Sequence, residues 1–432
     1  MEAPALRVAI LGAGNVGAAL LGILFDPTRQ PYLLEAVGAP LEVVGVGVRD
    51  ATKARPGIPS QLLTTDLASL VEGDVDVLVE LIGGVEQAYP FVRRALERGV
   101  SVVTANKALI AARGTELEAL ARSTGADLIF EAAVAGGIPI VRALRTSLIG
   151  ERINRVLGIV NGTTNFILSA MAGEGADYAD VLAEAQRLGY AEADPTADVE
   201  GYDAASKITI LAALSFGTPL EGVAIPREGI SRVTAADVAF ATRHHYVIKL
   251  LAVAERVGET AVSLRVHPTL VPDSHPLASV NGAMNAVFVE AANAGPLMWE
   301  GAGAGGRPTA SAVVGDIVEA SRNRLAKRRS AFPEVERSLT YFAPGELQSA
   351  FYVTVEVVDK PGVLAAVTTI FGEHGVSIRS MEQTGFGDEA RLVFSTHMAL
   401  ASDMTATLED LQQLDVVESL GLCLPILEDA GR

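Results

Sequence analysis

The chain has 432 residues, a formal net charge of −18 and one cysteine. This length predicts two or three domains, and a composition of 49% hydrophobic and 20% charged residues is typical of a folded, soluble protein. The acidic balance argues against nucleic acid and anionic membranes as partners, because both repel a negative surface. Cys423 alone excludes a disulfide framework and a cysteine-ligated zinc site. No apolar stretch is long enough to cross a bilayer, so we expect a cytoplasmic protein without membrane contact.

Short apolar runs alternate with helical patterns in the first third of the chain. Val, Ile and Leu fill these runs nearly without interruption, which is typical of strands buried on both faces of a sheet. The alternation predicts an α/β domain over residues 1–132 with a Rossmann-type, doubly wound parallel sheet. The expected strands are residues 6–11, 41–48, 75–82, 100–105 and 126–132.

The middle of the chain mixes helical and strand patterns. We expect an α+β domain over residues 133–325, whose last helix, residues 308–325, packs back on the first domain. Residues 326–349 are charged, contain proline and lack a clear periodicity, so they predict a linker. The expected helices of the middle domain are residues 178–188, 203–216 and 235–257, and its expected strands include residues 262–271 and 286–292.

A compact unit is expected over residues 350–432. Its elements follow the order β-α-β-β-α-β, which is typical of a ferredoxin-like fold. The turn Asp359-Lys360-Pro361-Gly362 opens its first helix. The expected strands are residues 351–358, 376–383, 390–399 and 416–426, and the expected helices are residues 363–375 and 404–411.

A GxGxxG motif follows the first expected strand and opens a helix. Its glycines, Gly12, Gly14 and Gly17, enclose Asn15 and Val16. Glycines at this spacing allow a tight turn, close approach of the backbone to a pyrophosphate, and close packing of helix on strand. The helix N-terminus favours the negative charge of that pyrophosphate. The motif therefore predicts a dinucleotide site, and a glycine-rich turn without a ligand is the simpler alternative.

An arginine follows the second expected strand, where an acidic residue would accept the ribose hydroxyls of NAD. Arg49 stands there, with Lys53 and Arg55 nearby. An arginine suits the 2′-phosphate of NADP, so the sequence favours NADP, whereas Asp50 next to it leaves NAD open. An ordinary surface arginine is the alternative.

Two further segments follow expected strands. Lys107, in TANKAL, lies beyond the carboxyl end of the fourth strand, where open α/β sheets bind ligands. A structural lysine at a helix start is the alternative, although helix N-termini disfavour cations. The turn FEAAVAGGIPIV, residues 130–141, has adjacent glycines and a proline that force an irregular backbone. Its carbonyl oxygens could face a hard cation, but its composition favours a domain-crossing turn.

Acidic residues crowd the loop before the helix expected at residues 203–216. Glu192 and Asp198 lie in that loop, and Asp203 and Lys207 are four residues apart on one helical face. Acids at such a junction can bind a substrate ammonium group beside a lysine that donates a proton. In isolation, a surface ion pair worth a few tenths of a kcal/mol is the simpler interpretation.

These motifs, in this order, closely resemble those of homoserine dehydrogenases. The matches spread over about residues 6–320, and DPTADVEG and NGTTNFIL are highly specific. The last domain resembles an ACT domain, so the whole chain is similar to monofunctional, feedback-regulated members of the family. The matching stretches are GAGNVG, TANKAL, EAAVAGGIPIV, GIVNGTTNFIL, LGYAEADPTADVEGYDAASK and GAGAGGRPTASAVVGDI.

The resemblance implies reversible, NAD(P)H-dependent reduction of aspartate semialdehyde to homoserine, in the branch toward threonine, methionine and isoleucine. It implies that Lys207 donates a proton to the carbonyl oxygen as hydride arrives. Glu192 and Asp203 would bind the substrate's amino group with support from Asp198, and Lys107 would bridge cofactor and substrate. The middle domain would carry catalysis, substrate binding and dimerisation.

The resemblance also implies contacts made by the backbone. Gly189 and Gly305 would approach the cofactor from the second domain. Ala133 and Ala135 stand where many members of the family have serine and glycine. A sodium ion would bind the carbonyl oxygens of Glu131, Val134, Gly136 and Ile138.

Lysine is scarce in this chain, since only six of its 34 basic residues are lysines. Reduction of an aldehyde needs a proton at oxygen, and an arginine at working pH could not readily donate one. In a chain that otherwise uses arginine, the positions of Lys107 and Lys207 mildly favour chemical roles.

Two other functions stay open on the sequence. A related NADP oxidoreductase of another small carbonyl compound would keep GAGNVG and the two lysines, but need not keep the acid-rich loop. A non-catalytic sensor of nucleotide and amino acid would not need Glu192, Asp203 and Lys207 together. For the leading function, we expect threonine as the effector of the ACT domain. We also expect a homodimer or homotetramer, by analogy with other ACT proteins.

Overall fold

A computed structural model describes residues 4–328, 339–386 and 389–428 of the chain. These residues form two compact units, each built from several chain segments. Unit 1 comprises residues 4–156, 206–223 and 285–328. Unit 2 comprises residues 157–205, 224–284, 339–386 and 389–428.

Unit 1 contains a six-stranded parallel sheet in the order β3-β2-β1-β4-β5-β6. This is the Rossmann order, so the predicted fold class of the N-terminal domain is confirmed. The central strand β1 is buried on both faces, since Val8, Ala9, Ile10 and Leu11 are each 0% exposed. The strands are β1 (Leu6–Leu11), β2 (Leu41–Gly47), β3 (Leu63–Thr64), β4 (Val77–Glu80), β5 (Ser101–Thr104) and β6 (Leu128–Ile129).

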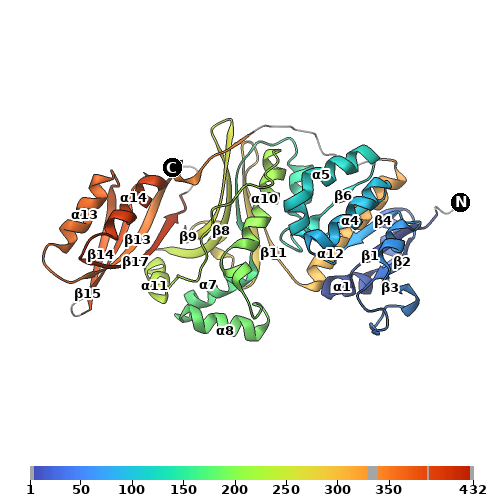
Figure 1. Cartoon of the computed structure of the whole chain (residues 1–432), viewed down its shortest axis with the longest axis horizontal. Coiled ribbons are helices and arrows are strands. Elements are labelled where there is room, and N and C mark those ends of the chain that lie inside the picture. The colour runs from blue at the N-terminus through green and yellow to red at the C-terminus, as the bar shows by residue number, and fades with distance from the viewer. Residues whose placement is uncertain (1–3, 329–338, 387–388, 429–432) are drawn as a thin grey trace. The chain divides into compact units, whose positions relative to one another are not determined.

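Helix α12 (Gly306–Leu325) packs on this sheet although it lies far along the chain from it (Figure 1). Its buried face presents Ala310, Val313, Ile317 and Ala320 to α1 and the strands. Small residues at both ends of this face allow the close approach of two helices. The other helices of the sheet are α1 (Asn15–Leu24), α2 (Gln30–Val37), α3 (Leu67–Glu72), α4 (Val85–Glu97) and α5 (Lys107–Thr124).

A buried network of charged groups anchors α12 to the turn after β6. Asp316 is 0% exposed and accepts hydrogen bonds from the Glu131 N–H at 2.9 Å and from Arg142 at 2.8 Å. Arg142 also donates to Glu319 at 3.0 Å. Burial, followed by the nearby Glu131 carboxylate, raises the pKa of Asp316, and the arginine opposes both effects. The network therefore depends on Arg142 to compensate two buried acids.

The α+β region contributes to both units. The strands β11 (Gly295–Ala302), β10 (Met284–Ala291) and β7 (Ile153–Ile159) lie in that order; β11 and nearly all of β10 belong to unit 1, and β7 runs from unit 1 into unit 2. In unit 2, β8 (Tyr246–Val257) and β9 (Ala261–Pro272) form a long antiparallel hairpin. The helices of this region in unit 2 are α7 (Gly162–Glu174), α8 (Tyr178–Leu188), α9 (Thr196–Val199) and α11 (Ala235–Arg243). Helix α10 (Tyr202–Phe216) runs from unit 2 into unit 1.

The helix predicted over residues 235–257 is wrong beyond its first nine residues. Helix α11 ends at Arg243, His245 adopts a left-handed φ of 64°, and β8 begins at Tyr246. Residues 248–254 are buried as they pair with β9. A continuous apolar run is compatible with both a buried helix and a strand buried on both faces, and only the pairing partner distinguishes them.

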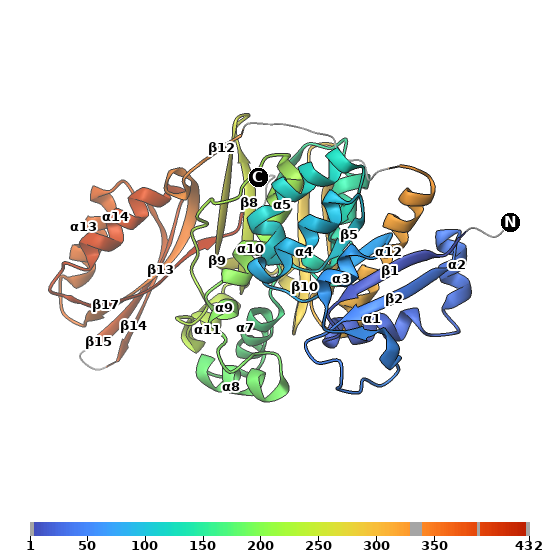
Figure 2. The same ribbon diagram turned by 45° about the vertical axis from the view of Figure 1, so that its right-hand side comes forward.

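The C-terminal region folds as predicted, with four strands in the antiparallel order β17-β13-β15-β14. Helices α13 and α14 cover one face of this sheet (Figures 1 and 2). Strand β17 continues onto the β8–β9 hairpin, where Ile426 pairs with Leu270. The elements are β13 (Gln348–Val358), α13 (Val363–Glu373), β14 (Ile378–Phe386), β15 (Glu389–Thr396), β16 (Ala399–Leu400), α14 (Ala401–Leu411) and β17 (Val417–Ile426).

The segment predicted as a linker is described only in part. Residues 329–338 lie outside the described residues, as do 429–432 at the end of the expected C-terminal unit. After residue 338, β12 (Thr340–Tyr341) pairs in parallel with the start of β9.

Of the helices that the structure describes, none is long and apolar enough to span a bilayer.

We expect Asp316→Ala to lower the free energy of unfolding by about 3 kcal/mol, because Arg142 and the Glu131 N–H lose a buried acceptor. The control is Glu184→Ala, which removes an exposed ion pair with Arg187 and should cost less than about 1 kcal/mol. Urea unfolding followed by circular dichroism measures both. Equal losses would contradict the anchoring role of the network.

Candidate active site

The GAGNVG loop in unit 1 shows why each glycine is needed. Gly12 has a φ of 107°, and a Cβ there would lie 2.7 Å from the Leu81 carbonyl oxygen. A Cβ on Gly17 would lie 2.2 Å from the Gly12 carbonyl oxygen. Gly14 is exposed, with nothing within 4 Å of its Cβ position. The outer glycines thus serve packing, whereas the middle one faces open space where a pyrophosphate can approach the backbone.

Two helices begin at this loop. Gly14 is the N-cap of α1 and Gly305 is the N-cap of α12, and neither helix has a side-chain cap. A Cβ on Gly306 would lie 2.9 Å from the Asn15 carbonyl oxygen, so the two helix starts adjoin each other. Their first N–H groups form a natural site for an anion. Gly305 therefore lies beside the loop in unit 1, whereas Gly189, the left-handed C-cap of α8, lies in unit 2.

The loop after β2 holds the basic residues near the expected ribose site. Arg49 is exposed there. The neighbouring Asp50 carboxylate accepts hydrogen bonds from the Thr52 hydroxyl at 2.6 Å and the Thr52 N–H at 2.9 Å, which lower the pKa of Asp50. Arg55 donates to the Asp50 and Lys53 carbonyl oxygens. The acid is thus engaged within its own loop, a feature that favours the arginine as the residue that meets the ribose.

Lys107 is the first residue of α5, and a network that the sequence did not reveal fixes its position. Asn106 caps α5 by accepting from the Leu109 N–H, and its own N–H donates to the Thr104 hydroxyl at 3.0 Å. That hydroxyl donates to Glu80 at 2.6 Å. Glu80 is 0% exposed, and its other oxygen accepts two backbone N–H groups of the loop after β4. The sequence signal that could have indicated this network is Glu80, an acidic residue at the end of the apolar run VLVE.

The acids of the DPTADVEG region meet in unit 2 at the N-terminus of α7. Asn161 caps that helix by accepting from the Thr164 N–H at 2.9 Å. Its amide nitrogen donates to Asp198 at 2.6 Å and to Asp203 at 3.0 Å. A neutral amide thus joins two carboxylates that would otherwise repel each other. Asn161 lies in the NGTTNFIL motif, but the sequence pattern alone did not indicate its role.

Thr163 adds a second tie to the same group. Its hydroxyl donates to the Tyr190 carbonyl oxygen at 2.6 Å and lies 3.3 Å from the second oxygen of Asp198. Glu192 lies in the same loop with an exposed side chain, and Gln186 donates to its carbonyl oxygen at 3.0 Å. The structure therefore brings Asp198 and Asp203 together and leaves the Glu192 carboxylate at the surface of the loop.

Lys207 lies on α10, one turn after Asp203. The two residues are 9% and 7% exposed, and their spacing places them on the same face of the helix. Side chains buried to this extent do not form a surface ion pair. The simpler interpretation of the sequence, an exposed pair, therefore does not hold.

The turn expected to hold a cation is buried and irregular. Ala135 and Gly136 have φ values of 55° and 53°, and a Cβ on Gly136 would lie 2.5 Å from the Gly303 carbonyl oxygen. The Glu131 carboxylate is engaged by the Val141 and Arg142 N–H groups, each at 2.8 Å. No described residues form a cluster of three or more His, Cys, Asp or Glu that could hold a metal. Any cation here would therefore rely on backbone carbonyl oxygens.

A second buried lysine, which the sequence did not single out, contacts the first turn of α7. Lys249 on β8 is 2% exposed and donates to the Asn165 side chain at 3.0 Å and the Val280 carbonyl oxygen at 2.5 Å. Asn165 also donates to the carbonyl oxygens of residues 280, 282 and 284. Burial lowers the pKa of Lys249 to about 8. Lys249 thus supports the first turn of α7 through Asn165, next to the capped N-terminus.

Known proteins and protein-family models match nearly the whole length of this chain. A family model described as homoserine dehydrogenase matches residues 139–318, and a second, for the NAD-binding domain of homoserine dehydrogenase, matches residues 12–131. An ACT domain model matches residues 351–416. A homoserine dehydrogenase of Corynebacterium glutamicum is 49% identical over 430 residues, which cover 98% of this chain and 96% of that protein.

The chain belongs to the homoserine dehydrogenase family.

Solved structures of homoserine dehydrogenases agree with this. One from Thiobacillus denitrificans has a TM-score of 0.93 at 41% identity, and the match covers 98% of this chain and 99% of that one. A hyperthermophilic archaeal homoserine dehydrogenase in complex with NADPH has a TM-score of 0.62 at 33% identity, covering 74% and 98% of the two chains.

Family membership confirms the leading hypothesis from the sequence. The chain is an NAD(P)-dependent oxidoreductase of amino-acid biosynthesis that interconverts aspartate semialdehyde and homoserine, and it carries a C-terminal ACT regulatory domain. The two alternatives, another semialdehyde reductase and a non-catalytic sensor, give way to it.

The buried Lys249 predicts a specific pH dependence. Because its pKa falls from 10.5 to about 8 on folding, only the unfolded chain binds this proton between those values. Stability relative to Lys249→Met should therefore rise with pH over this window, by up to about 3 kcal/mol. Urea unfolding of both proteins at several pH values measures the difference. A difference that stays constant would contradict the lowered pKa.

Proposed function

We propose that Asp198 and Asp203, held together by Asn161, bind the ammonium group of aspartate semialdehyde. The observation that carries this proposal is the Asn161 amide, which donates to both carboxylates. A neutral donor lets the two carboxyl groups lie close together, and a pair of acids at one place favours a cationic ligand group. Glu192, exposed in the loop between α8 and α9, is proposed as a third carboxylate for that group.

Lys207 is proposed as the proton donor. When NADP(H) is bound, it supplies the hydride that reduces the aldehyde carbon. The developing alkoxide oxygen needs a proton, and the ammonium group of a lysine can give one as a general acid. Lys107, at the start of α5, is proposed to contact cofactor and substrate, with Glu80, Thr104 and Asn106 fixing the helix start that carries it.

NADP is proposed as the preferred cofactor. The loop after β2 offers Arg49 to a 2′-phosphate, whereas the Asp50 carboxylate, which would suit the ribose hydroxyls of NAD, is engaged by Thr52. The archaeal relative was solved with NADPH, which agrees with this preference. Gly12, Gly14, Asn15, Val16, Gly17 and Gly305 would line the pyrophosphate site in unit 1. Family resemblance also suggests a role in cofactor binding for Gly189 at the end of α8.

A sodium ion is proposed at the turn after β6. The carbonyl oxygens of Glu131, Val134, Gly136 and Ile138 would hold it, since these residues share one buried, irregular turn. Hard cations prefer oxygen ligands, and backbone ligation tolerates Ala135 at the position where many relatives have glycine.

Threonine is proposed as the effector that the ACT domain binds, and a homodimer or homotetramer as the working assembly. Both proposals rest on the presence of the ACT domain and on family analogy.

Lys207→Ala is expected to lower kcat roughly 100- to 10,000-fold, because the alkoxide loses its proton donor. The dissociation constant for NADPH should not change. Oxidation of NADPH with aspartate semialdehyde measures the rate, and Lys360→Ala, an exposed lysine of the ACT turn, is the control. Unchanged turnover in Lys207→Ala would remove this residue from its role, and no turnover by the wild type would overturn the activity itself.

Arg49→Ala should raise the KM for NADPH about 10-fold, because the 2′-phosphate loses a cationic partner. The KM for NADH, which lacks that phosphate, serves as the internal control and should stay the same. Steady-state kinetics with both cofactors test this. A parallel change for both cofactors would contradict a role in selecting NADP.

Threonine is expected to inhibit the full-length enzyme at millimolar concentrations, because a ligand that favours one state of the ACT domain shifts the whole chain toward it. Initial rates in a threonine titration measure the effect, with D-threonine as the control for non-specific binding. Equal rates with and without L-threonine would contradict threonine as effector.

A further inference from the structure

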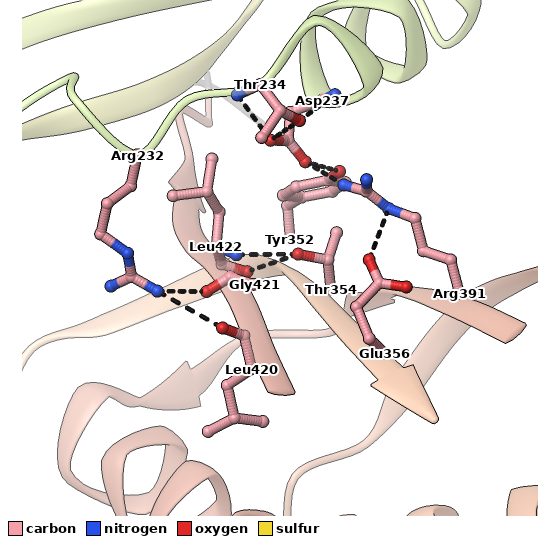
Figure 3. Close-up of polar contacts among 10 residues, drawn as sticks. All are labelled: Arg232, Thr234, Asp237, Tyr352, Thr354, Glu356, Arg391, Leu420, Gly421 and Leu422. Carbon is pink, nitrogen blue, oxygen red and sulfur yellow. Dashed lines mark hydrogen bonds and ion pairs between the residues drawn. The ribbon is translucent and has the colours of Figure 1, made fainter. Parts of the chain in front are cut away.

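One carboxylate in unit 2 joins the ACT sheet to helix α11 (Figure 3). Asp237, in the first turn of α11, is 1% exposed. One of its oxygens accepts from the Thr234 hydroxyl at 2.6 Å and the Thr234 N–H at 3.0 Å, which closes a capping box. A capping box fixes where a helix begins and the direction from which the chain enters it.

The other oxygen of Asp237 accepts hydrogen bonds from the ACT domain. It accepts a hydrogen bond from the Tyr352 hydroxyl on β13 at 2.8 Å and another from the Arg391 guanidinium on β15 (Figure 3). Tyr352 is 1% exposed, and Arg391 lies 3.6 Å from Glu356. Burial and the Asp237 carboxylate both raise the pKa of Tyr352, so its hydroxyl remains a donor. The start of α11 is therefore held by two adjacent strands of the ACT sheet.

Two further contacts tie the same stretch of chain to the ACT domain. Arg232 donates to the Gly421 carbonyl oxygen on β17 at 2.7 Å (Figure 3). The ring of Phe240 lies 4.9 Å from the ring of Tyr352, centroid to centroid. Movement within β13, β15 or β17 would thus reach the chain between residues 232 and 240.

The chain just before Arg232 is fixed next to the acid cluster, the name used here for Asp198 and Asp203. The Ile230 N–H donates to the Val199 carbonyl oxygen at 2.9 Å, and the Val233 N–H donates to Ile230 at 3.0 Å. A Cβ on Gly229 would lie 2.5 Å from that same Val199 oxygen, so the backbones pack directly. Val199 is the last residue of α9 and the neighbour of Asp198. Residues 229–237, here called the relay segment, therefore contact the ACT sheet at one end and α9 at the other.

We propose that the relay segment positions Asp198 and transmits the state of the ACT sheet to it. Tyr352, Arg391 and Asp237 are then positioning residues, since none of them touches the acid cluster itself. The path is short and consists of hydrogen bonds and backbone packing within one compact unit, so a displaced strand shifts α9 rather than being absorbed by a flexible loop. This inference rests on the proposed role of Asp198 in binding the substrate ammonium.

Tyr352→Phe tests the ACT end of the relay, because it removes one hydroxyl that reaches Asp237. Thr354→Val is its matched control: Thr354 is buried two residues along the same strand, but its hydroxyl bonds to Leu422 inside the ACT sheet (Figure 3). We expect Tyr352→Phe to raise the KM for aspartate semialdehyde about 3- to 10-fold, with kcat and the KM for NADPH unchanged, as one lost hydrogen bond predicts. Thr354→Val should leave all three constants unchanged.

Gly229→Ala tests the other end, since its new methyl group would displace the relay segment from Val199. It should raise the same KM without touching the ACT domain. The double variant Gly229→Ala/Tyr352→Phe should raise the KM by less than the product of the two single effects, because both break one path.

Asp198→Asn, measured alongside, separates this inference from the function on which it rests. A raised KM in Asp198→Asn with an unchanged KM in Tyr352→Phe and Gly229→Ala would overturn the relay alone. An unchanged KM in Asp198→Asn would overturn the proposed role of that acid and the relay with it. Multiplicative effects in the double variant, or an equal rise in Thr354→Val, would also overturn the relay.

Discussion

The pairing of two carboxylates through one amide is the constraint on which the proposed chemistry depends. Asp198 and Asp203 both accept from Asn161, the residue that begins α7. The amide must be held in one orientation to serve both acids, and the Thr164 N–H provides this by occupying its oxygen. Lys249 and Asn165 also fix the first turn of α7 to β8 and to residues 280–284. The acid site is thus anchored on the N-terminus of α7, to which Asn161 ties Asp198 of the short helix α9.

Helix starts form two other parts of the proposed site. In unit 1, α1 and α12 begin side by side at Gly14 and Gly305 without side-chain caps, which leaves their N–H groups for a pyrophosphate. Helix α5, in contrast, begins under a full cap from Asn106, which the buried Glu80 orients through Thr104. Uncapped starts suit an anionic ligand, whereas a capped start suits a side chain that must be placed accurately. The acidic net charge of the chain does not oppose the anionic cofactor, because the site proposed for it consists of local backbone dipoles and a few basic residues.

The sequence predicted those features whose causes are local. Alternating apolar runs identified the parallel sheet, the GAGNVG spacing identified the dinucleotide loop, and turn residues delimited the ACT strands. It failed where the cause lies far along the chain. Residues 246–257 form a strand only because β9 pairs with them. Asn161 and Asp198 are 37 positions apart, and Asp237 and Arg391 are 154 apart, so neither pair is visible as a pattern. The lysine count was informative but incomplete, since it singled out Lys107 and Lys207 and missed the buried Lys249.

The most direct test is the kcat/KM of Asn161→Ala for aspartate semialdehyde. The control is Asn281→Ala, because the Asn281 amide is exposed and donates to the nearby Ser279 carbonyl oxygen. Loss of a charge-assisted donor shared by two acids predicts a decrease of roughly 10- to 100-fold in Asn161→Ala, with the dissociation constant for NADPH unchanged and the control equal to wild type. A kcat/KM in Asn161→Ala equal to that of the wild type would contradict the claim that this amide organises the substrate site.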